Sequence, residues 1–207
     1  MPASPTRKEL THERIVQTAS QTIRRSGYDG TGVADIMKAA GLTHGGFYAH
    51  FPSRTALLAE AADHAGADGL ARLRQVAQDA PQGQGLAALI DSYLSGRHVK
   101  AVEQGCPVAA LGSEMHRQAP EVRRAATGRI KELIALVQAQ AAQASSDAAP
   151  ANASEPSTHD TALAVVSSLI GSLVLARAVD DPALSKAVLK ASRAFLHAHA
   201  PGHGRSG

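Results

Sequence analysis

The chain contains, from Thr31 to Leu58, the sequence TGVADIMKAAGLTHGGFYAHFPSRTALL. Apolar residues recur at helical spacing up to Gly41, which stands where a left-handed turn residue is expected at the end of a helix. Thr43 is a candidate N-cap for the next helix, in which Phe47 and Phe51 point inward. Two short helices joined in this way are typical of a helix-turn-helix, whose second helix enters the major groove of DNA.

Two consecutive glycines interrupt the predicted recognition helix. Each of Gly45 and Gly46 costs a helix about 1 kcal/mol relative to alanine. One explanation is close approach to bases or sugar-phosphate, where a Cβ atom would collide, and the alternative is a loose, partly 3₁₀ turn. Thr43, His44 and the glycine surface are the candidates for contact with bases. For His44, the alternative is a solvent-exposed side chain without a role.

Three further side chains are candidates for contact with phosphate. Tyr48 lies off the face formed by Phe47 and Phe51, so its hydroxyl suits a phosphate, or its ring a thymine methyl, better than the core. His50 and Arg54 are the other two candidates. Phosphate contacts fix the register of a protein on the duplex and supply affinity that depends on salt.

These residues resemble the N-terminal signature of the TetR/AcrR family of transcriptional regulators. The resemblance spans about residues 11–62 and rests on Arg14-Ile15, Ala19, Gly27-Tyr28, Ile36, Ala39-Ala40-Gly41-Leu42-Thr43, Gly45, Phe47-Tyr48, His50-Phe51, Arg54 and Leu57. Gly46 is an additional glycine, and Arg54 stands where lysine is commoner. The resemblance adds Thr31 to the candidate phosphate contacts. It implies an N-terminal three-helix head joined to a larger helical bundle that binds an effector and forms dimers.

Composition also favours an all-α protein. The 207 residues are 44% hydrophobic and only 3% aromatic, which suits helices that pack through small side chains. The net charge of +3 is a weak signal for DNA binding. The single cysteine, Cys106, excludes an intramolecular disulfide and suits the reducing cytoplasm. The most apolar stretch, residues 162–176, is broken by three serines and is shorter than the roughly 20 residues that span a bilayer, so we expect no membrane association.

The pattern predicts a flexible arm over residues 1–9, a helix-turn-helix domain over 10–56 and an effector-binding and dimerisation domain over 57–200. A mobile linker is expected at 144–157 and a disordered tail at 201–207. The expected helices outside the helix-turn-helix core cover about residues 10–25, 53–77, 86–102, 108–115, 120–137, 160–179 and 182–199. Thr31 and Ser53 are candidate N-caps.

The last two helices are expected to form an interface between two copies of the chain. Their apolar residues cover more than one face: Leu163, Val166, Leu169, Ile170, Leu173, Val174, Leu184, Val188, Leu189 and Phe195. An ordinary intramolecular core is the alternative. In the resembled family, the final two helices of each subunit form a four-helix dimer interface. We therefore expect a homodimer that binds double-stranded DNA at a palindromic operator.

The bundle formed by about residues 86–137 is expected to hold a small-molecule effector, and a solid core is the alternative. The segment from Gly105 to Glu114 resembles a TetR subgroup whose cysteine senses electrophiles or oxidants, so Cys106 is a candidate sensor. The alternative is a buried structural thiol. No catalytic residue, cofactor or metal site is expected. The competing functions are an enzyme with Cys106 as nucleophile and a helical interaction protein that does not bind DNA.

Overall fold

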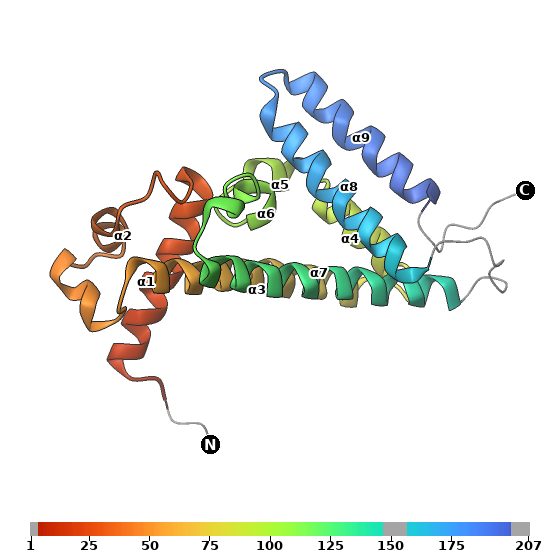
Figure 1. The fold of residues 1–207 in the computed structure, drawn as a ribbon. Helices are drawn as coiled ribbons and strands as arrows, with labels where there is room; N and C mark the ends of the chain where they lie inside the picture. Colours follow the sequence, from red (N-terminus) through yellow and green to blue (C-terminus); the bar gives the residue numbers. More distant parts are fainter. Residues whose placement is uncertain (1–3, 147–156, 200–207) are drawn as a thin grey trace, which may run out of the picture. The chain divides into compact units, whose positions relative to one another are not determined.

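The computed structural model describes residues 4–146 and 157–199, and within these ranges the secondary structure is entirely helical (Figure 1). The elements are α1 (Arg7–Ser26), α2 (Val33–Ala39), the 3₁₀ helix η1 (His44–Ala49), α3 (Arg54–Asp79), α4 (Gly85–Tyr93), α5 (Gly96–Lys100), α6 (Pro107–Leu111), the 3₁₀ helix η2 (Met115–Arg117), α7 (Pro120–Ser146), α8 (Thr158–Ala178) and α9 (Pro182–His199). The prediction of an all-α fold is confirmed.

The chain divides into two compact units. The first unit contains Met1–Asp68 and Val102–Arg129, and the second contains Gly69–Ala101 and Ile130–Gly207. Helices α3 and α7 each contribute residues to both units. The predicted head, residues 10–56, is therefore only part of the first unit.

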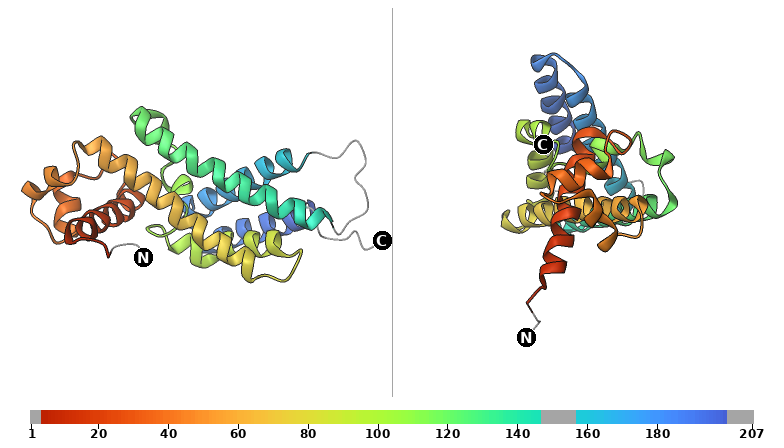
Figure 2. Two further views of the ribbon diagram at one scale, coloured as in Figure 1. Left: turned by 90° about the horizontal axis from the view of Figure 1, so that it is seen from below. Right: turned by 90° about the vertical axis from the view of Figure 1, so that its left-hand side faces the viewer.

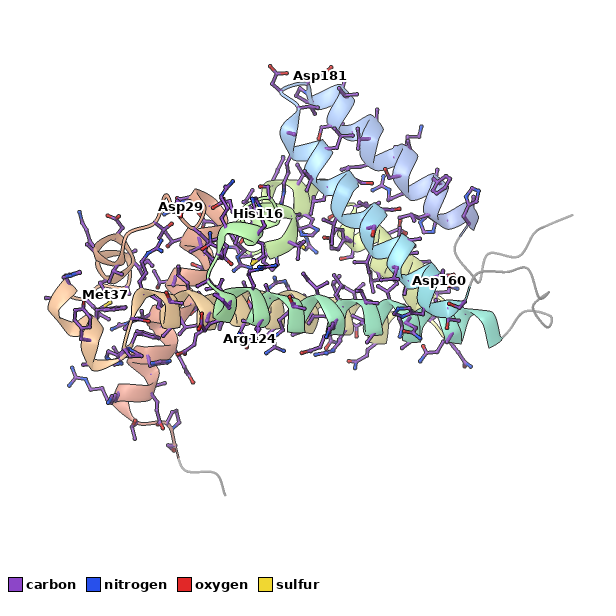
Figure 3. The ribbon with its side chains drawn as sticks, viewed as in Figure 1. Asp29, Met37, His116, Arg124, Asp160 and Asp181 are labelled. Atoms are coloured by element: carbon purple, nitrogen blue, oxygen red, sulfur yellow. The ribbon has the colours of Figure 1, made fainter. Side chains whose placement is uncertain are left out.

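The core of the first unit draws on both of its stretches. Ile15 and Ile23 of α1 pack with Phe47 of η1, and Leu111 and Val122 belong to the same cluster of buried side chains. Met37 of α2, which is labelled in Figure 3, is also part of this cluster. Apolar spacing in the sequence predicted the contributions of α1, α2 and η1. It did not predict that Leu111 and Val122, placed in the effector-binding domain, pack against these helices.

The N-terminal arm is shorter than predicted because α1 begins at Arg7. Thr6 is the N-cap: its hydroxyl accepts a hydrogen bond from the Glu9 amide (3.3 Å), and the Thr6 amide donates to the Glu9 carboxylate (2.6 Å). This reciprocal capping box stabilises the first turn. Residues 7–9, predicted to be flexible, are therefore helical, and residues 1–3 lie outside the described residues.

The turns around α2 follow the sequence prediction in part. Gly41 has φ +71°, the left-handed conformation predicted for it. The N-cap of α2 is Gly32 and not Thr31, and the Thr43 side chain makes no capping hydrogen bond. The segment after Thr43 is 3₁₀ and not α-helical, in line with the alternative of a partly 3₁₀ turn. Ser53 caps α3 as predicted, with its hydroxyl 3.1 Å from the Ala56 amide.

In the second unit, the helix predicted over residues 86–102 is broken into α4 and α5. Ser95 is the N-cap of α5, and its hydroxyl accepts from the His98 amide at 3.2 Å. Helices α8 and α9 run side by side as an antiparallel pair (Figure 2). Figure 3 labels Asp181 at the turn between them, where its carboxylate accepts from the Ala183 amide at 2.8 Å.

The face of the α8–α9 pair is partly exposed. Four apolar side chains that were predicted to form an interface are buried within the chain instead: Val166, Leu169, Leu173 and Leu189. Five large apolar side chains remain exposed: Leu163, Val174, Leu175, Leu184 and Phe195. Among the described helices, α8 alone is long and apolar enough to cross a membrane, judged by length and composition only. Most of the predicted linker and all of the predicted tail lie outside the described residues.

Candidate nucleic-acid interface

The recognition segment, which we define as residues 43–50, presents most of its polar side chains to solvent. Thr43 and His44 are exposed, and Tyr48 is 72% exposed. Phe47 holds the segment to the core of the first unit, and its ring meets the Tyr48 ring edge-on at a centroid distance of 5.1 Å. The segment therefore presents a hydroxyl, an imidazole and a phenol on one short, anchored turn.

The two glycines of the segment are not required by the fold of the chain. A Cβ atom built on Gly45 meets no atom within 4 Å, and one built on Gly46 meets only Met37 Cε at 3.7 Å and Thr43 Oγ1 at 3.9 Å. Neither glycine has a positive φ; among the described residues only Gly27, Gly41 and Gly83 do. Alanine would fit at Gly45 at lower conformational cost.

His50 lies at the edge of the segment beside a second histidine. The two rings, of His12 and His50, are 6.1 Å apart, and Nε2 of His12 lies 2.6 Å from the Glu60 carboxylate. Burial lowers the pKa of His50, and the nearby His12 and Lys8 lower it further. Its Nδ1 atom is shielded from solvent and has no hydrogen-bond partner among the described residues. The imidazole is therefore neutral over a wider pH range than usual.

Thr31 does not lie where a phosphate contact requires it. Its side chain is 2% exposed, and its hydroxyl donates to the carbonyl oxygen of Gly27 at 2.8 Å. The hydroxyl thus closes the turn between α1 and α2 from inside. The sequence prediction that Thr31 contacts phosphate is therefore corrected, because its polar group faces the chain itself.

Arg54 is also engaged within the first unit. Its Nη2 atom donates to the carbonyl oxygen of Tyr28 and to that of Thr31, the latter at 3.1 Å. Both carbonyls belong to the turn between α1 and α2. Arg54 therefore holds this turn in the free protein, and its contact with phosphate stays a prediction.

Sequence reasoning missed Glu114 as a residue of this region. Its Oε2 atom accepts a hydrogen bond from the Tyr28 amide at 2.9 Å, although the two residues are 86 positions apart. Burial, with a contribution from this carboxylate, raises the pKa of the Tyr28 hydroxyl to about 12. No local signal in the sequence connects Glu114 to the head.

The candidate sensor Cys106 is the N-cap of α6 and is 8% exposed. In the second unit, Arg177 donates to the carbonyl oxygens of His98 (2.7 Å) and Val99 (3.2 Å). Among the described residues no three His, Cys, Asp or Glu side chains gather to hold a metal ion. Nε2 of His197, in α9, lies 2.9 Å from the Asp91 carboxylate.

Two family models match the chain over separate ranges. Residues 15–61 match the family described as bacterial regulatory proteins, tetR family. Residues 83–192 match the tetracyclin repressor-like C-terminal domain. The first range contains the whole recognition segment, and the second contains Cys106 and Glu114.

A relative with similar sequence is an HTH-type transcriptional regulator of Mycobacterium tuberculosis. It is 31% identical over 202 residues, which cover 93% of this chain and 97% of the relative. Among solved structures, a TetR-family regulator from Cytophaga hutchinsonii has a TM-score of 0.81 at 17% identity, over 96% of this chain and 98% of that one. The reduced form of Escherichia coli NemR has a TM-score of 0.77 at 19% identity, with coverages of 90% and 94%. These structures establish a shared fold.

Proposed function

Because the chain belongs to the TetR family and is a DNA-binding transcriptional regulator, we propose that it is a repressor that binds a palindromic operator as a homodimer. A small-molecule effector releases it from the operator. Thr43, His44, Gly45 and Gly46 face the bases, while Tyr48 and His50 contact phosphate. The protein acts in the cytoplasm, where the DNA lies.

The observation that carries this proposal is the open space around Gly45. The free protein gives no reason for glycine there, since φ is not positive and a Cβ atom would meet nothing within 4 Å. Glycine nevertheless costs conformational entropy relative to alanine. A surface that approaches closely from outside explains the missing side chain. The exposed Tyr48 beside it supports DNA as that surface.

The test compares Gly45→Ala with Gly128→Ala. Gly128 lies in α7 and is exposed, and a Cβ atom built on it would also meet nothing within 4 Å. Both substitutions are expected to keep or raise stability, by up to about 1 kcal/mol. Only Gly45→Ala is expected to weaken operator binding, by about ten-fold or more, because its methyl group would meet the DNA.

The measurement is fluorescence anisotropy with labelled duplexes from the region upstream of the protein's own gene, at fixed salt concentration. An operator that lies outside this upstream region is found by selecting the duplexes that bind the protein from a pool of random sequences. Equal affinity of Gly45→Ala and the wild type for the selected duplex would contradict the placement of this segment against DNA. Failure to select any duplex would contradict the repressor itself.

The homodimer is proposed from the exposed apolar face of α8 and α9. Phe195 of α9 is 58% exposed. Leu175 of α8 and Leu184 of α9 are exposed as well. TetR-family regulators typically act as dimers, so a second copy of the chain is the occupant that fits this face. Sedimentation at micromolar concentration should give twice the chain mass of 21.3 kDa. A monomer at that concentration would contradict the proposal.

The effector is proposed to bind within the helical bundle, since TetR-family regulators bind small molecules as well as DNA. Cys106 is the candidate for a covalent effector. If an electrophile acts through it, operator binding should be lost on treatment with a thiol-reactive compound and kept in Cys106→Ser. Binding that is lost equally in both proteins would remove Cys106 from this role.

A further inference from the structure

The turn between α1 and α2, residues 27–31, is held by side chains from two other parts of the first unit. The Tyr28 amide donates to Oε2 of Glu114 at 2.9 Å. The carbonyl oxygens of Tyr28 and Thr31 accept from Nη2 of Arg54, the second at 3.1 Å. The backbone of Tyr28 is therefore held on both sides: its amide by the negatively charged Glu114 and its carbonyl by the positively charged Arg54. Charge-assisted hydrogen bonds of this kind are stronger than neutral ones.

Glu114 also lies directly against the backbone of the turn. A Cβ atom on Gly27 would be 2.7 Å from Oε1 of Glu114 and 3.1 Å from Oε2, so a side chain there would displace the carboxylate. Gly27 has φ +78°, which also favours glycine. The Tyr28 ring is buried in the core beside this turn. The carboxylate is thus a close-packed part of the turn and not a loose surface group.

The turn fixes the point where α2 begins. Thr31 is followed directly by Gly32, the N-cap of α2, and α2 packs against η1, the central part of the recognition segment. A change in the turn therefore changes the position of α2 and, through it, of the recognition segment. Packed interiors transmit such shifts because they contain few voids that could absorb them.

We propose that Glu114 is a positioning residue for DNA reading. It holds the Tyr28 amide opposite Arg54, and through the turn and α2 it sets the position of the recognition segment. Glu114 lies outside residues 15–61, which match the DNA-binding family, and inside the C-terminal match. The inference deepens the proposed function, and only the DNA part of its test depends on that function.

The same stretch of chain supplies a matched control. Glu103 forms an exposed ion pair with Arg25 of α1, with Nη1 of the arginine 3.2 Å from Oε1 of the glutamate. This pair lies on the helix and not on the turn. Exposed ion pairs of this kind contribute little to stability. Glu103→Ala therefore removes a carboxylate from the same segment without touching the Tyr28 amide.

The first measurement is amide hydrogen exchange of the full-length protein, followed by mass spectrometry. In Glu114→Ala, exchange across residues 27–50 is expected to be about ten-fold faster, because a buried amide loses its acceptor. Glu114→Met, which fills the same space without an acceptor, should behave alike. Glu114→Gln should stay close to the wild type, since its amide oxygen can still accept. Unchanged exchange across residues 27–50 in both the alanine and methionine variants would overturn the inference.

The second measurement is the ratio of affinities for the selected operator and for a random duplex. A positioning role predicts that Glu114→Ala lowers this ratio by about ten-fold, that glutamine largely restores it, and that Glu103→Ala leaves it unchanged. A merely structural role would lower the unfolding temperature but keep the ratio, and that result would overturn the inference. A wild type without any operator preference would contradict the proposed function, while the exchange data would still decide whether Glu114 holds the turn.

Discussion

The α1–α2 turn and the recognition segment lie close together in sequence but differ in the partners of their polar groups. Those of the turn form hydrogen bonds within the chain, whereas several of those in the segment are exposed. In the turn, Thr31 is buried and bonded to Gly27, and the backbone is bound by two charged side chains. In the recognition segment, Tyr48 is exposed and Gly45 is surrounded by open space. The free protein therefore explains the residues of the turn by their hydrogen bonds. It does not explain why position 45 is glycine or why the Tyr48 ring is exposed.

This difference separates residues that serve the fold from residues that serve a partner. Threonine and arginine suit both tasks, since each can donate to a phosphate or to a backbone carbonyl. Only their surroundings decide which. The comparison therefore predicts that substitutions in the turn change stability, while substitutions of the exposed side chains in the segment mainly change DNA binding.

The largest effect is expected from Arg54→Met, which should lower the free energy of unfolding. If it did not, the comparison between the turn and the segment would be wrong. The substitution keeps much of the side-chain volume but removes the donor to the Tyr28 and Thr31 carbonyl oxygens. Loss of hydrogen bonds from a charged group should lower the free energy of unfolding by about 2–3 kcal/mol, as measured by urea denaturation. Arg25→Met, which removes only an exposed ion pair, should change it by less than about 1 kcal/mol.

An Arg54→Met protein with wild-type stability and weakened DNA binding would contradict this assignment. It would return Arg54 to the phosphate contact that the sequence predicted.

Tyr48→Phe sharpens the comparison from the other side. The hydroxyl is exposed in the free protein, so unfolding should change by no more than about 0.5 kcal/mol. If the hydroxyl donates to phosphate, affinity should fall by about three- to ten-fold, equally for operator and random duplexes. A change in base preference, seen by repeating the duplex selection with the variant, would assign Tyr48 to base reading instead.

The smallest effect is expected from pH. The pKa of His50 is lowered by burial and by the nearby His12 and Lys8, so the free protein disfavours the protonated ring. A nearby phosphate favours the protonated ring and raises this pKa, so DNA binding takes up a proton and strengthens as pH falls below about 6.5. By linkage, log K should change by at most about one unit per pH unit and protomer.

His50→Gln should flatten this dependence measurably between about pH 5.5 and 7.5. A slope identical to that of the wild type would show that His50 does not titrate on binding. In the free protein the sign is opposite: stability from a neutral His50 is present above the ordinary pKa and decreases as pH falls.

The parts of the fold that the sequence predicted depend on local patterns. Phe47 and Phe51 are buried, and Gly41 has a positive φ, because helical spacing and turn chemistry determine these features within a few residues. The early start of α1 was also readable, since Thr6 and Glu9 stand at capping-box spacing. The break at Ser95 has a similar local cause, a serine N-cap.

The errors concern residues whose role depends on distant neighbours. Thr31 was predicted to contact phosphate because its chemistry fits, but its hydroxyl is buried and donates within the chain. For Arg54, the sequence did not predict the hydrogen bonds to the carbonyl oxygens of Tyr28 and Thr31. Glu114 was invisible because its partner, Tyr28, lies 86 positions away. Likewise, Val166 and Leu169 were placed at an interface because periodicity cannot distinguish a neighbour within the chain from a second copy. The roles of the recognition segment stay predictions.

The core that unites Leu111 and Val122 with α1 and η1 bears on how such regulators can be recombined. A chimeric protein that takes residues 1–61 from this chain and the remainder from a relative would inherit the recognition segment. It would also replace the buried side chains of Leu111 and Val122 and the Glu114 carboxylate that binds the Tyr28 amide. Exchange of DNA specificity between relatives should therefore succeed only when the chimera takes residues 102–129 from the same protein as the N-terminal part.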